Sequence, residues 1–363
     1  MVRPMRVLVG LSGGVDSTVT ALLLRDAGHE VIGATMMLWS GRYKGGTRDA
    51  CFGPGEAEDL AAVEAFCRKF SIPHIRLDRA QLYETAVLAP WRAGFLAGRT
   101  PNPCVLCNPL LKFTIPDAAR AAGAQFDCFA TGHYARLDAG GPGGRRRLLR
   151  AAEHARDQSY FLHRLSQEQL AGVMFPLGGM TKAEVRAFAR EKGLLEVAGK
   201  PDSQDFYSGD RAELIGEPDR PGDVVDEAGN VLARHTGYWK VTIGQRKGLG
   251  ISGTEESMYV TDIDPVHNRI VVGPRPSTVR HALTATHVNW VSVPQPPAGT
   301  KISCGIKIRS VGDPVEGVEA VVAENGDFRA RFPCGIAGVA PGQSAVLYDG
   351  GAVLAGGFIS DPA

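Results

Sequence analysis

The stretch SGGVDS, residues 12–17, constrains the fold of this chain more than any other feature. The apolar residues 6–11 before it are typical of a buried strand, and residues 17–27 after it have a helical pattern that Gly28 would end. Two adjacent glycines let successive backbone N–H groups point at one anion, at the positive end of the helix. A strand, a glycine loop and a helix start predict a phosphate-binding site in an α/β sheet.

The loop lacks the lysine of the commonest phosphate loop, which ends in Gly-Lys-Ser or Gly-Lys-Thr. Asp16 stands near the predicted anion instead, and a carboxylate is tolerated there mainly when Mg²⁺ lies between the two groups. We therefore predict a nucleotide site at which Asp16 binds Mg²⁺. The alternative is an ordinary glycine turn between a strand and a helix.

Two further apolar runs predict strands of the same sheet. Residues 31–36 (VIGATM) end at Met36, and residues 126–130 are followed by TGHY, which contains Gly132 and His133. Strands that alternate with helical segments predict a doubly wound parallel α/β sheet, whose ligands lie beyond the carboxyl ends of the strands. Met36 and Gly132 would fall at that edge, whereas His133 is equally well explained as an ordinary loop histidine.

Length and charge limit the class of protein. With 363 residues the chain is too long for one ordinary core. Forty Lys and Arg residues against 39 Asp and Glu give no global attraction to nucleic acid or an anionic membrane, so RNA binding must come from local patches. We see no signal-peptide pattern and no apolar run of about 18 residues. We expect a cytoplasmic protein with no membrane or DNA partner.

The sequence pattern changes near residue 205, where helical periodicity gives way to short alternating strands between turns. We predict a nucleotide-binding domain at residues 1–205, a small central β-rich domain at 206–280 and a C-terminal β-barrel at 281–363. Strands of that barrel are expected at residues 301–309, 328–332 and 344–348.

The seven cysteines have irregular spacings that do not suggest a disulfide framework. Their apolar surroundings predict that four of them are core residues, namely Cys67, Cys128, Cys304 and Cys334. Cys104 and Cys107 differ, because RTPNPCVLCN places them among prolines and asparagines, which predicts a loop. Basic neighbours such as Arg99 and Lys112 would activate a thiolate there.

Structural zinc would need a second close pair of cysteines. The chain offers only Cys51, in RDACFGPGEAED, as another loop cysteine. A four-ligand zinc site is therefore disfavoured, and a pair of reactive thiols is preferred.

The ordered motifs of the chain resemble those of a known family. SGGVDS resembles the PP-loop of the ATP pyrophosphatases, which holds the β and γ phosphates as pyrophosphate leaves. Together with VIGATMMLW, RTPNPCVLCN, ATGHYAR, DQSYFL, KPDSQD, TIGQRKGLGI and KIR, it resembles the tRNA-specific 2-thiouridylases, the MnmA family. That resemblance covers nearly the whole chain and implies ATP-dependent 2-thiolation of the wobble uridine in the tRNA anticodon loop.

The resemblance also implies roles for individual residues. Cys107 matches the catalytic cysteine of the family. ATP would be held by Gly10, Leu11, Ser12, Gly13, Gly14, Val15, Asp16, Ser17, Met36 and Gly132. The target base would meet Asn102, Pro103 and Cys104, and tRNA would touch Arg156, Asp157, Gln158, Arg309 and Ser310.

Two departures from the family pattern bear on the sulfur chemistry. Cys104 stands where the family often has aspartate, and Tyr207 replaces the usual second cysteine. A persulfide route needs two thiols in contact, so we predict that Cys104 and Cys107 form the relay and end as a disulfide. The rival is an iron–sulfur cluster, of the [4Fe–4S] type, held by Cys51, Cys104 and Cys107. Tyr207 would either stack on a nucleobase or pack beside Phe206.

Three other segments are candidates for contacts with tRNA. Lys301, Lys307 and Arg309 would form a basic stripe on one face of a strand, and residues 145–147 would form the basic edge of a hairpin. The loop at residues 242–251 places two cations between glycines. A solvated strand face and a solubilising hairpin edge are the plainer explanations.

Two different functions stay open on the residues alone. Other PP-loop enzymes adenylate a carboxyl or carbonyl oxygen and form an amide, which would make the cysteines structural. A chain without activity could bind RNA under the control of ATP. The sequence identifies neither the sulfur donor, whether a protein or a sulfide source, nor the tRNA set.

Overall fold

We describe the protein from a computed structural model, over residues 3–45, 50–200 and 205–361. Its N-terminal part is built on a five-stranded sheet in the order β3-β2-β1-β4-β7, and each pair of neighbours is parallel. These strands are β1 Arg6–Gly10, β2 Glu30–Met37, β3 His74–Asp78, β4 Cys128–Ala130 and β7 Val173–Met174. The predicted doubly wound parallel sheet is confirmed.

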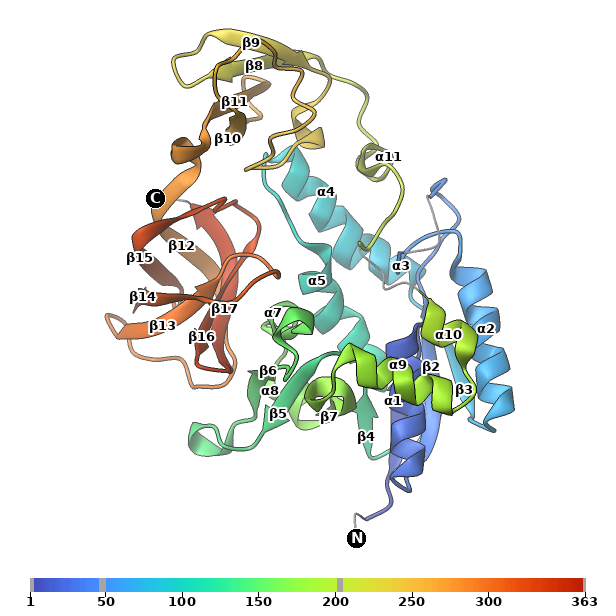
Figure 1. Ribbon diagram of the computed structural model, residues 1–363. Helices are drawn as coiled ribbons and strands as arrows, with labels where there is room; N and C mark the ends of the chain where they lie inside the picture. The colour runs from blue at the N-terminus through green and yellow to red at the C-terminus, as the bar shows by residue number, and fades with distance from the viewer. Residues whose placement is uncertain (1–2, 46–49, 201–204, 362–363) are drawn as a thin grey trace.

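Helices cover both faces of this sheet because β1 is apolar on both sides (Figure 1). Val7 and Val9 face α1 Val15–Asp26, α2 Glu56–Lys69 and α9 Lys182–Glu191, whereas Leu8 faces α6 Ile115–Ala121. The helix α1 ends as expected, with Gly28 at φ +88° after the cap residue. The sheet is therefore a buried, two-sided support for the loop that follows β1.

A long helical arm leads from the sheet to the central β-rich part. It comprises α3 Ala80–Tyr83, a π turn at Glu84–Leu88 and α4 Ala89–Leu96, followed by α5 Pro103–Leu110. The central sheet has the order β10-β11-β8-β9. Trp91 and Cys107 of the arm share one apolar core with Val224 and Ile270 of the central sheet. The central strands are β8 Gly222–Asp226, β9 Val231–His235, β10 Met258–Asp264 and β11 Arg269–Pro274.

The C-terminal part is a closed six-stranded barrel in the order β12-β15-β14-β13-β16-β17, with β12 pairing β17. Leu283, Phe328 and Leu347 fill it. The predicted barrel and its three expected strands are confirmed. The strands are β12 Val279–Trp290, β13 Lys301–Lys307, β14 Val315–Val322, β15 Phe328–Ala337, β16 Ser344–Asp349 and β17 Ala352–Asp361.

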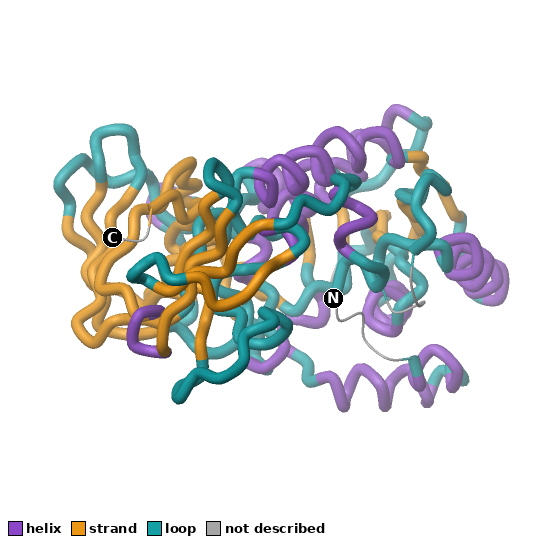
Figure 2. The backbone as a smooth tube through the Cα atoms, turned by 90° about the horizontal axis from the view of Figure 1, so that it is seen from above, coloured by secondary structure: helices purple, strands orange, loops and turns teal. Residues whose placement is uncertain are grey.

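A hairpin of the N-terminal part extends the sheet of the barrel. Its strands are β5 Ala135–Asp138 and β6 Arg147–Arg150, and β6 pairs β17 at Leu149 and Ala352. The remaining helices are α7 Ser159–Leu162, α8 Gln167–Ala171, α10 Leu195–Gly199 and α11 Arg211–Ile215. The view from above in Figure 2 separates the strand-rich half of the molecule from the helical half. Over the part of the chain described, no helix has the length and apolarity to span a bilayer.

The structure corrects the expected basic surfaces. Lys307 is buried, because the N-terminal part covers that end of β13, so the predicted basic stripe does not form. In the hairpin, Arg147 pairs with Asp138, and Arg145 donates to the carbonyl oxygens of Trp290 and Val291. These two arginines of the predicted basic edge therefore make structural contacts.

The expected core cysteines divide into three cases. Cys67 and Cys304 are buried, as predicted, and Cys128 is half-buried with its sulfur 3.5 Å from that of Met174. Cys334 is exposed, so its assignment to the core is wrong. The pairing of β15 with β12 shifts register between Ala282 and Arg280, and this irregularity ends the alternation on which the prediction rested.

Candidate active site

The glycine loop lies where the strand order of the sheet reverses. Its strand β1 pairs β2 on one side and β4 on the other, which is the position at which ligands bind to doubly wound sheets. Gly13 has φ +78°, a conformation open to glycine, and Gly14 begins α1 without a side chain to cap it. Ser17 donates to the Gly14 carbonyl oxygen at 3.1 Å and accepts from the Ser12 N–H at 3.2 Å. The free end of α1 can therefore receive an anion.

Gly132 supports this loop by close packing. A Cβ atom at Gly132 would lie 2.8 Å from the carbonyl carbon of Asp16 and 2.9 Å from the nitrogen of Ser17. The segment after β4 thus touches the first turn of α1, and only glycine allows that approach. Met36, half-buried at the end of β2, lies at the same edge of the sheet.

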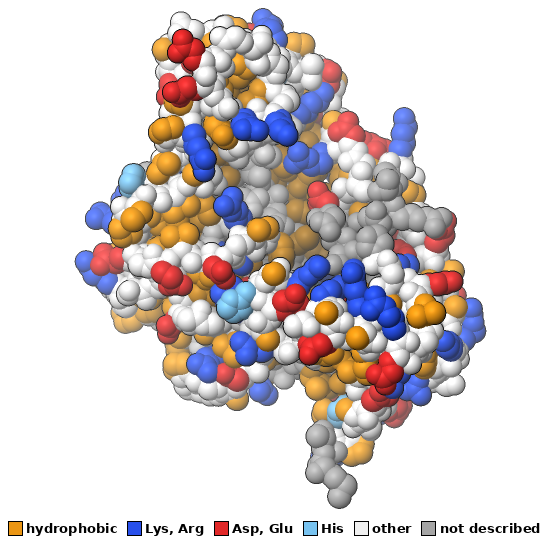
Figure 3. All heavy atoms as spheres, viewed as in Figure 1, with side chains coloured by type: hydrophobic (Ala, Val, Ile, Leu, Met, Phe, Trp, Pro, Cys, Tyr) orange, Lys and Arg blue, Asp and Glu red, His pale blue; other side chains and the backbone are white. Residues whose placement is uncertain are grey.

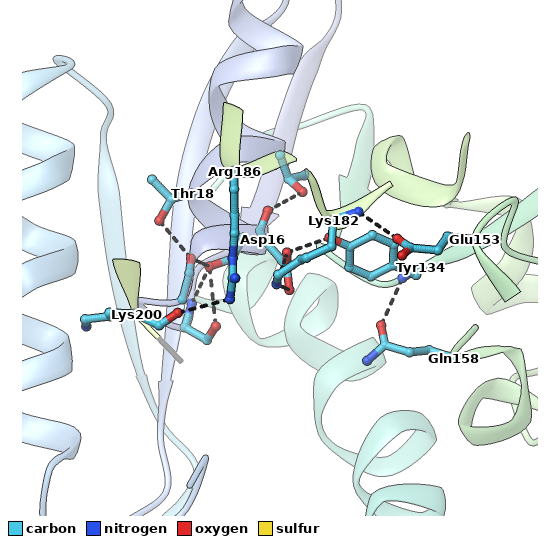
Figure 4. A network of polar contacts seen from close by, with 12 residues as sticks. Asp16, Thr18, Tyr134, Glu153, Gln158, Lys182, Arg186 and Lys200 are labelled. Carbon is cyan, nitrogen blue, oxygen red and sulfur yellow. Dashed lines mark hydrogen bonds and ion pairs between the residues drawn. The ribbon is translucent and has the colours of Figure 1, made fainter. Parts of the chain in front are cut away.

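The lysine that the loop lacks is supplied by α9, as Figure 4 shows. Lys182 Nζ lies 2.8 and 2.9 Å from the two carboxylate oxygens of Asp16, and the Tyr134 hydroxyl donates to the same carboxylate at 2.8 Å. The Lys182 side chain is 6% exposed. Sequence reasoning missed this contact, because 166 residues separate the partners.

A second lysine borders the loop. Lys200 Nζ donates to the carboxylate of Asp59 at 3.0 Å and lies 3.4 Å from the Gly13 carbonyl oxygen. Arg186, one turn along α9 from Lys182, donates to the Lys200 carbonyl oxygen at 3.5 Å. The segment from Lys182 to Lys200 therefore adds cations to the loop, which favours binding of a phosphate chain.

Cys104 and Cys107 lie on a helix, so the prediction of a loop is wrong. Pro103 occupies the first turn of α5, where its missing N–H costs nothing, and the Asn102 side chain accepts from the Cys104 N–H at 3.0 Å. Residues three apart in a helix share one face. The helix therefore places Cys104 and Cys107 on one face, Cys104 in its first turn and Cys107 in its second.

The two thiols are protonated at neutral pH, contrary to the expected activation. Burial raises the pKa of Cys104 to about 12 and that of Cys107 to about 11, although the nearby Lys112 ammonium lowers both. Cys107, Cys51 and Cys104 in turn raise the pKa of Lys112, against the effect of burial. Arg99 lies instead beside Gly342 of the barrel. Lys112 thus lies close enough to all three sulfurs to interact with them electrostatically.

Tyr207 packs in the apolar core that joins the helical arm to the central sheet. Its side chain is buried near Phe206 and Phe52, and its hydroxyl donates to Glu213 at 2.6 Å and accepts from the Gly45 N–H at 3.2 Å. The plainer of the two expected roles is the one observed. The residues before it, 201–204 of the KPDSQD motif, lie outside the described part of the chain.

The segments expected to touch tRNA meet at the junction of the N-terminal part and the barrel. Arg156 and Arg309 are exposed, and Ser310 follows in the same loop. Asp157 is buried against Lys307 at 3.6 Å, so its carboxylate does not reach the surface. Gln158 accepts from the Tyr134 N–H at 2.9 Å.

Two further expected site residues are less accessible than the loop prediction implied. Pro103 is buried and Asn102 is half-buried. His133 is buried, contacts the Thr131 hydroxyl at 2.8 Å, and has a pKa well below its usual range because of burial and Lys112. It is therefore neutral. Figure 3 shows this face hollowed between the central β-domain and the α/β layer, with Lys and Arg side chains on both rims.

Fold and site define a class of protein: an α/β nucleotide-binding protein with a PP-loop-type glycine turn at its switch point and a pair of thiols on a neighbouring helix. Residues 5–207 match the family described as "tRNA methyl transferase HUP domain". Residues 215–274 match a "tRNA methyl transferase PRC-barrel domain", and residues 280–359 an "Aminomethyltransferase beta-barrel domain".

The chain belongs to the family of tRNA-specific 2-thiouridylases named MnmA. The relative from Endomicrobium trichonymphae is 41% identical over 364 residues, covering 99% of this chain and all of the relative. The relative from Trichormus variabilis is 40% identical, covering 98% of each chain. Among solved structures, a 4-thiouridine synthetase–RNA complex with bound ATP aligns with 54% of this chain and 43% of its own, at 19% identity and a TM-score of 0.35.

Proposed function

We propose that this protein converts the wobble uridine of certain tRNAs to 2-thiouridine, using ATP and a sulfur relay through Cys104 and Cys107. Membership of the 2-thiouridylase family is the main support for this reaction. The placement of both thiols on one face of α5 supports the route of the sulfur.

The first step is adenylation of the uracil. The C2 oxygen attacks the α-phosphorus of ATP, the bond to pyrophosphate breaks, and the C2 oxygen becomes part of an AMP leaving group. In this proposal the N–H groups at the start of α1 hold the departing pyrophosphate, together with Lys182 and Lys200, which lie at the same loop. Mg²⁺ brought with the nucleotide would share the Asp16 carboxylate with Lys182, because a carboxylate oxygen is a suitable Mg²⁺ ligand.

The second step moves the sulfur. The terminal sulfur of a persulfide on Cys107 attacks C2, and AMP leaves. The Cys104 thiolate then attacks the Cys107 sulfur, which forms a Cys104–Cys107 disulfide and releases the thiocarbonyl of the product. A dithiol reductant restores the two thiols. The Cys107 thiolate then attacks the outer sulfur of a persulfide on a donor protein, which leaves as a thiol, and Cys107 is again a persulfide. The first turn of α5 must tighten for the disulfide, since helical neighbours three apart are about 5–6 Å apart at Cβ.

The relay has no third thiol where the family has its second cysteine, because Tyr207 fills that position and is buried. The iron–sulfur alternative does not fit the described residues, among which no group of three His, Cys, Asp or Glu side chains is arranged to hold a metal ion. We therefore derive no step through a cluster.

The target base must leave its stack to reach α5, at a cost of a few kcal/mol. In this proposal Asn102 and Cys104 at the start of α5 meet the base, and Arg156, Arg309 and Ser310 hold the tRNA backbone. The hollow with Lys and Arg side chains on both rims is the face that we propose for the anticodon loop (Figure 3).

The deciding experiment is thiolation of a defined tRNA with ATP, a persulfide-bearing donor protein and a dithiol reductant, read by mass spectrometry of the nucleosides. We expect 2-thiouridine, AMP and pyrophosphate with the native protein and with Cys334→Ser, which changes an exposed cysteine outside the site. Cys104→Ser and Cys107→Ser should each remove the product. Product from Cys104→Ser at the native rate would exclude the relay, and iron and sulfide retained in anaerobically purified active protein would favour the cluster.

A further inference from the structure

We propose that Lys307 is a positioning residue that couples tRNA held by the barrel to the geometry of the nucleotide loop. Lys307 ends β13 of the barrel, and its side chain is 2% exposed. Its ammonium lies 3.6 Å from Asp157, whose side chain is fully buried in the N-terminal part. The inference rests on the proposed function, because it assigns tRNA to the barrel.

The Asp157 carboxylate makes five polar contacts with described residues. One carboxylate oxygen accepts from the N–H groups of Ala151 at 3.2 Å and Ser159 at 3.1 Å. The other accepts from the Ser159 hydroxyl at 2.9 Å and lies 3.5 Å from Arg150 Nε. Lys307 is the contact that comes from the barrel. The carboxylate therefore has one orientation, and the barrel contributes to it.

The contacts continue without a break from Asp157 to the nucleotide loop. The next residue, Gln158, exchanges two hydrogen bonds with Tyr134, each 2.9 Å long. The Tyr134 hydroxyl donates to Asp16 at 2.8 Å, and Asp16 also pairs with Lys182 (Figure 4). A shift of the barrel that moves Lys307 can thus reach the first turn of α1 through the backbone and side chains of Asp157, Gln158 and Tyr134.

Charge gives a second reason to assign Lys307 a positional role. Burying an ion pair adds little stability compared with apolar side chains of the same volume, since desolvation offsets the attraction. Burial lowers the pKa of Lys307 while Asp157 raises it. Arg150 also contacts Asp157 and pairs with the exposed Asp313 of the barrel at 2.5 Å. Stability alone therefore does not explain a second buried cation at Asp157.

The two segments expected to touch tRNA flank this pair. Arg156 precedes Asp157, and Arg309 lies two residues after Lys307. The Lys307–Asp157 contact therefore lies beneath the surface at which both segments would meet tRNA, and binding there would press the junction together. By linkage, tRNA should tighten nucleotide binding by the same factor by which nucleotide tightens tRNA binding.

The test measures the dissociation constant of a non-hydrolysable ATP analogue with and without unmodified tRNA. We expect tRNA to tighten analogue binding at least about fivefold in the native protein. In Lys307→Met, the ratio of the dissociation constant without tRNA to that with tRNA should fall to within about twofold of one. Lys301→Met is the matched control, because Lys301 lies on the same strand, is exposed and pairs with Glu319 at 3.3 Å. It should keep the native ratio.

The titration also separates a folding defect from lost coupling. The number of binding sites per chain reports the fraction of folded protein, whereas the ratio of the two dissociation constants does not depend on that fraction. If Lys307→Met does not fold, Tyr134→Phe decides, since it removes the hydroxyl on Asp16 and should also abolish the coupling. The inference would be overturned if tRNA tightened analogue binding in Lys307→Met as much as in the native protein, or did so in Tyr134→Phe where that variant decides. It would also be overturned if tRNA did not change analogue binding in the native protein. Failure of the native protein to thiolate tRNA would instead refute the proposed function.

Discussion

The contact between Gly132 and the nucleotide loop gives the sharpest prediction, because it depends on a single added carbon. Gly132 has an ordinary backbone conformation, so alanine there adds no torsional strain. Its Cβ would lie 2.8 Å from the Asp16 carbonyl carbon, about 0.6 Å closer than an ordinary van der Waals contact. That carbon belongs to the backbone at the start of a packed helix, so the loop must move.

The expected loss of stability and of ATP affinity in Gly132→Ala follows from two effects. Overpacking of this kind costs about 1–3 kcal/mol, which for a domain of this size lowers the melting temperature by about 2–10 °C. Displacing a phosphate-binding loop by about half an ångström should weaken ATP binding and tRNA-dependent AMP release by roughly tenfold, since a misplacement of 1 Å can cost about a hundredfold.

The assay compares Gly132→Ala with Gly179→Ala by thermal unfolding and by titration with a non-hydrolysable ATP analogue. Gly179 is an exposed glycine whose added Cβ would meet nothing within 4 Å, so its variant should behave as the native protein. Native affinity together with a native melting temperature in Gly132→Ala would refute the claim that this contact positions the loop.

Three further predictions concern the site. Burial raises the pKa of Cys104 to about 12 and that of Cys107 to about 11. The alkylation rate of both thiols should therefore rise about tenfold per pH unit from pH 7 to 9, as read by peptide mass spectrometry. A plateau of the rate near pH 8 would contradict this prediction. In Tyr207→Phe, loss of the hydrogen bond to Glu213 should lower the free energy of unfolding by about 1.5–3 kcal/mol, and the variant should still thiolate tRNA. Loss of thiolation in a variant that stays folded would instead show a chemical role for the hydroxyl. Lys182→Met leaves Asp16 without its ammonium partner, so ATP affinity should fall at least tenfold in the same titration. Unchanged affinity would show that Lys182 does not contribute to nucleotide binding.

The order of local patterns was enough to predict the architecture. Residues 6–28 contain a strand, a glycine loop and a helix with its stop signal, and each signal acts over a few residues. The parallel sheet and the barrel followed from such signals repeated along the chain. The prediction failed where a local rule met an exception, as at Pro103, which reads as a loop residue but is tolerated at the first position of α5.

Contacts between distant segments needed the tertiary structure. Nothing near SGGVDS indicates that Lys182 neutralises Asp16, and the alternation of β13 predicted an exposed Lys307 where the structure buries it. The local pattern of a strand shows which residues share a face, but what covers that face depends on how distant domains pack. Local patterns thus indicate the chemistry of the loop and the cysteines. Which charges meet depends on the packing of the domains, because Coulomb attraction and burial depend on distance in space and not along the chain.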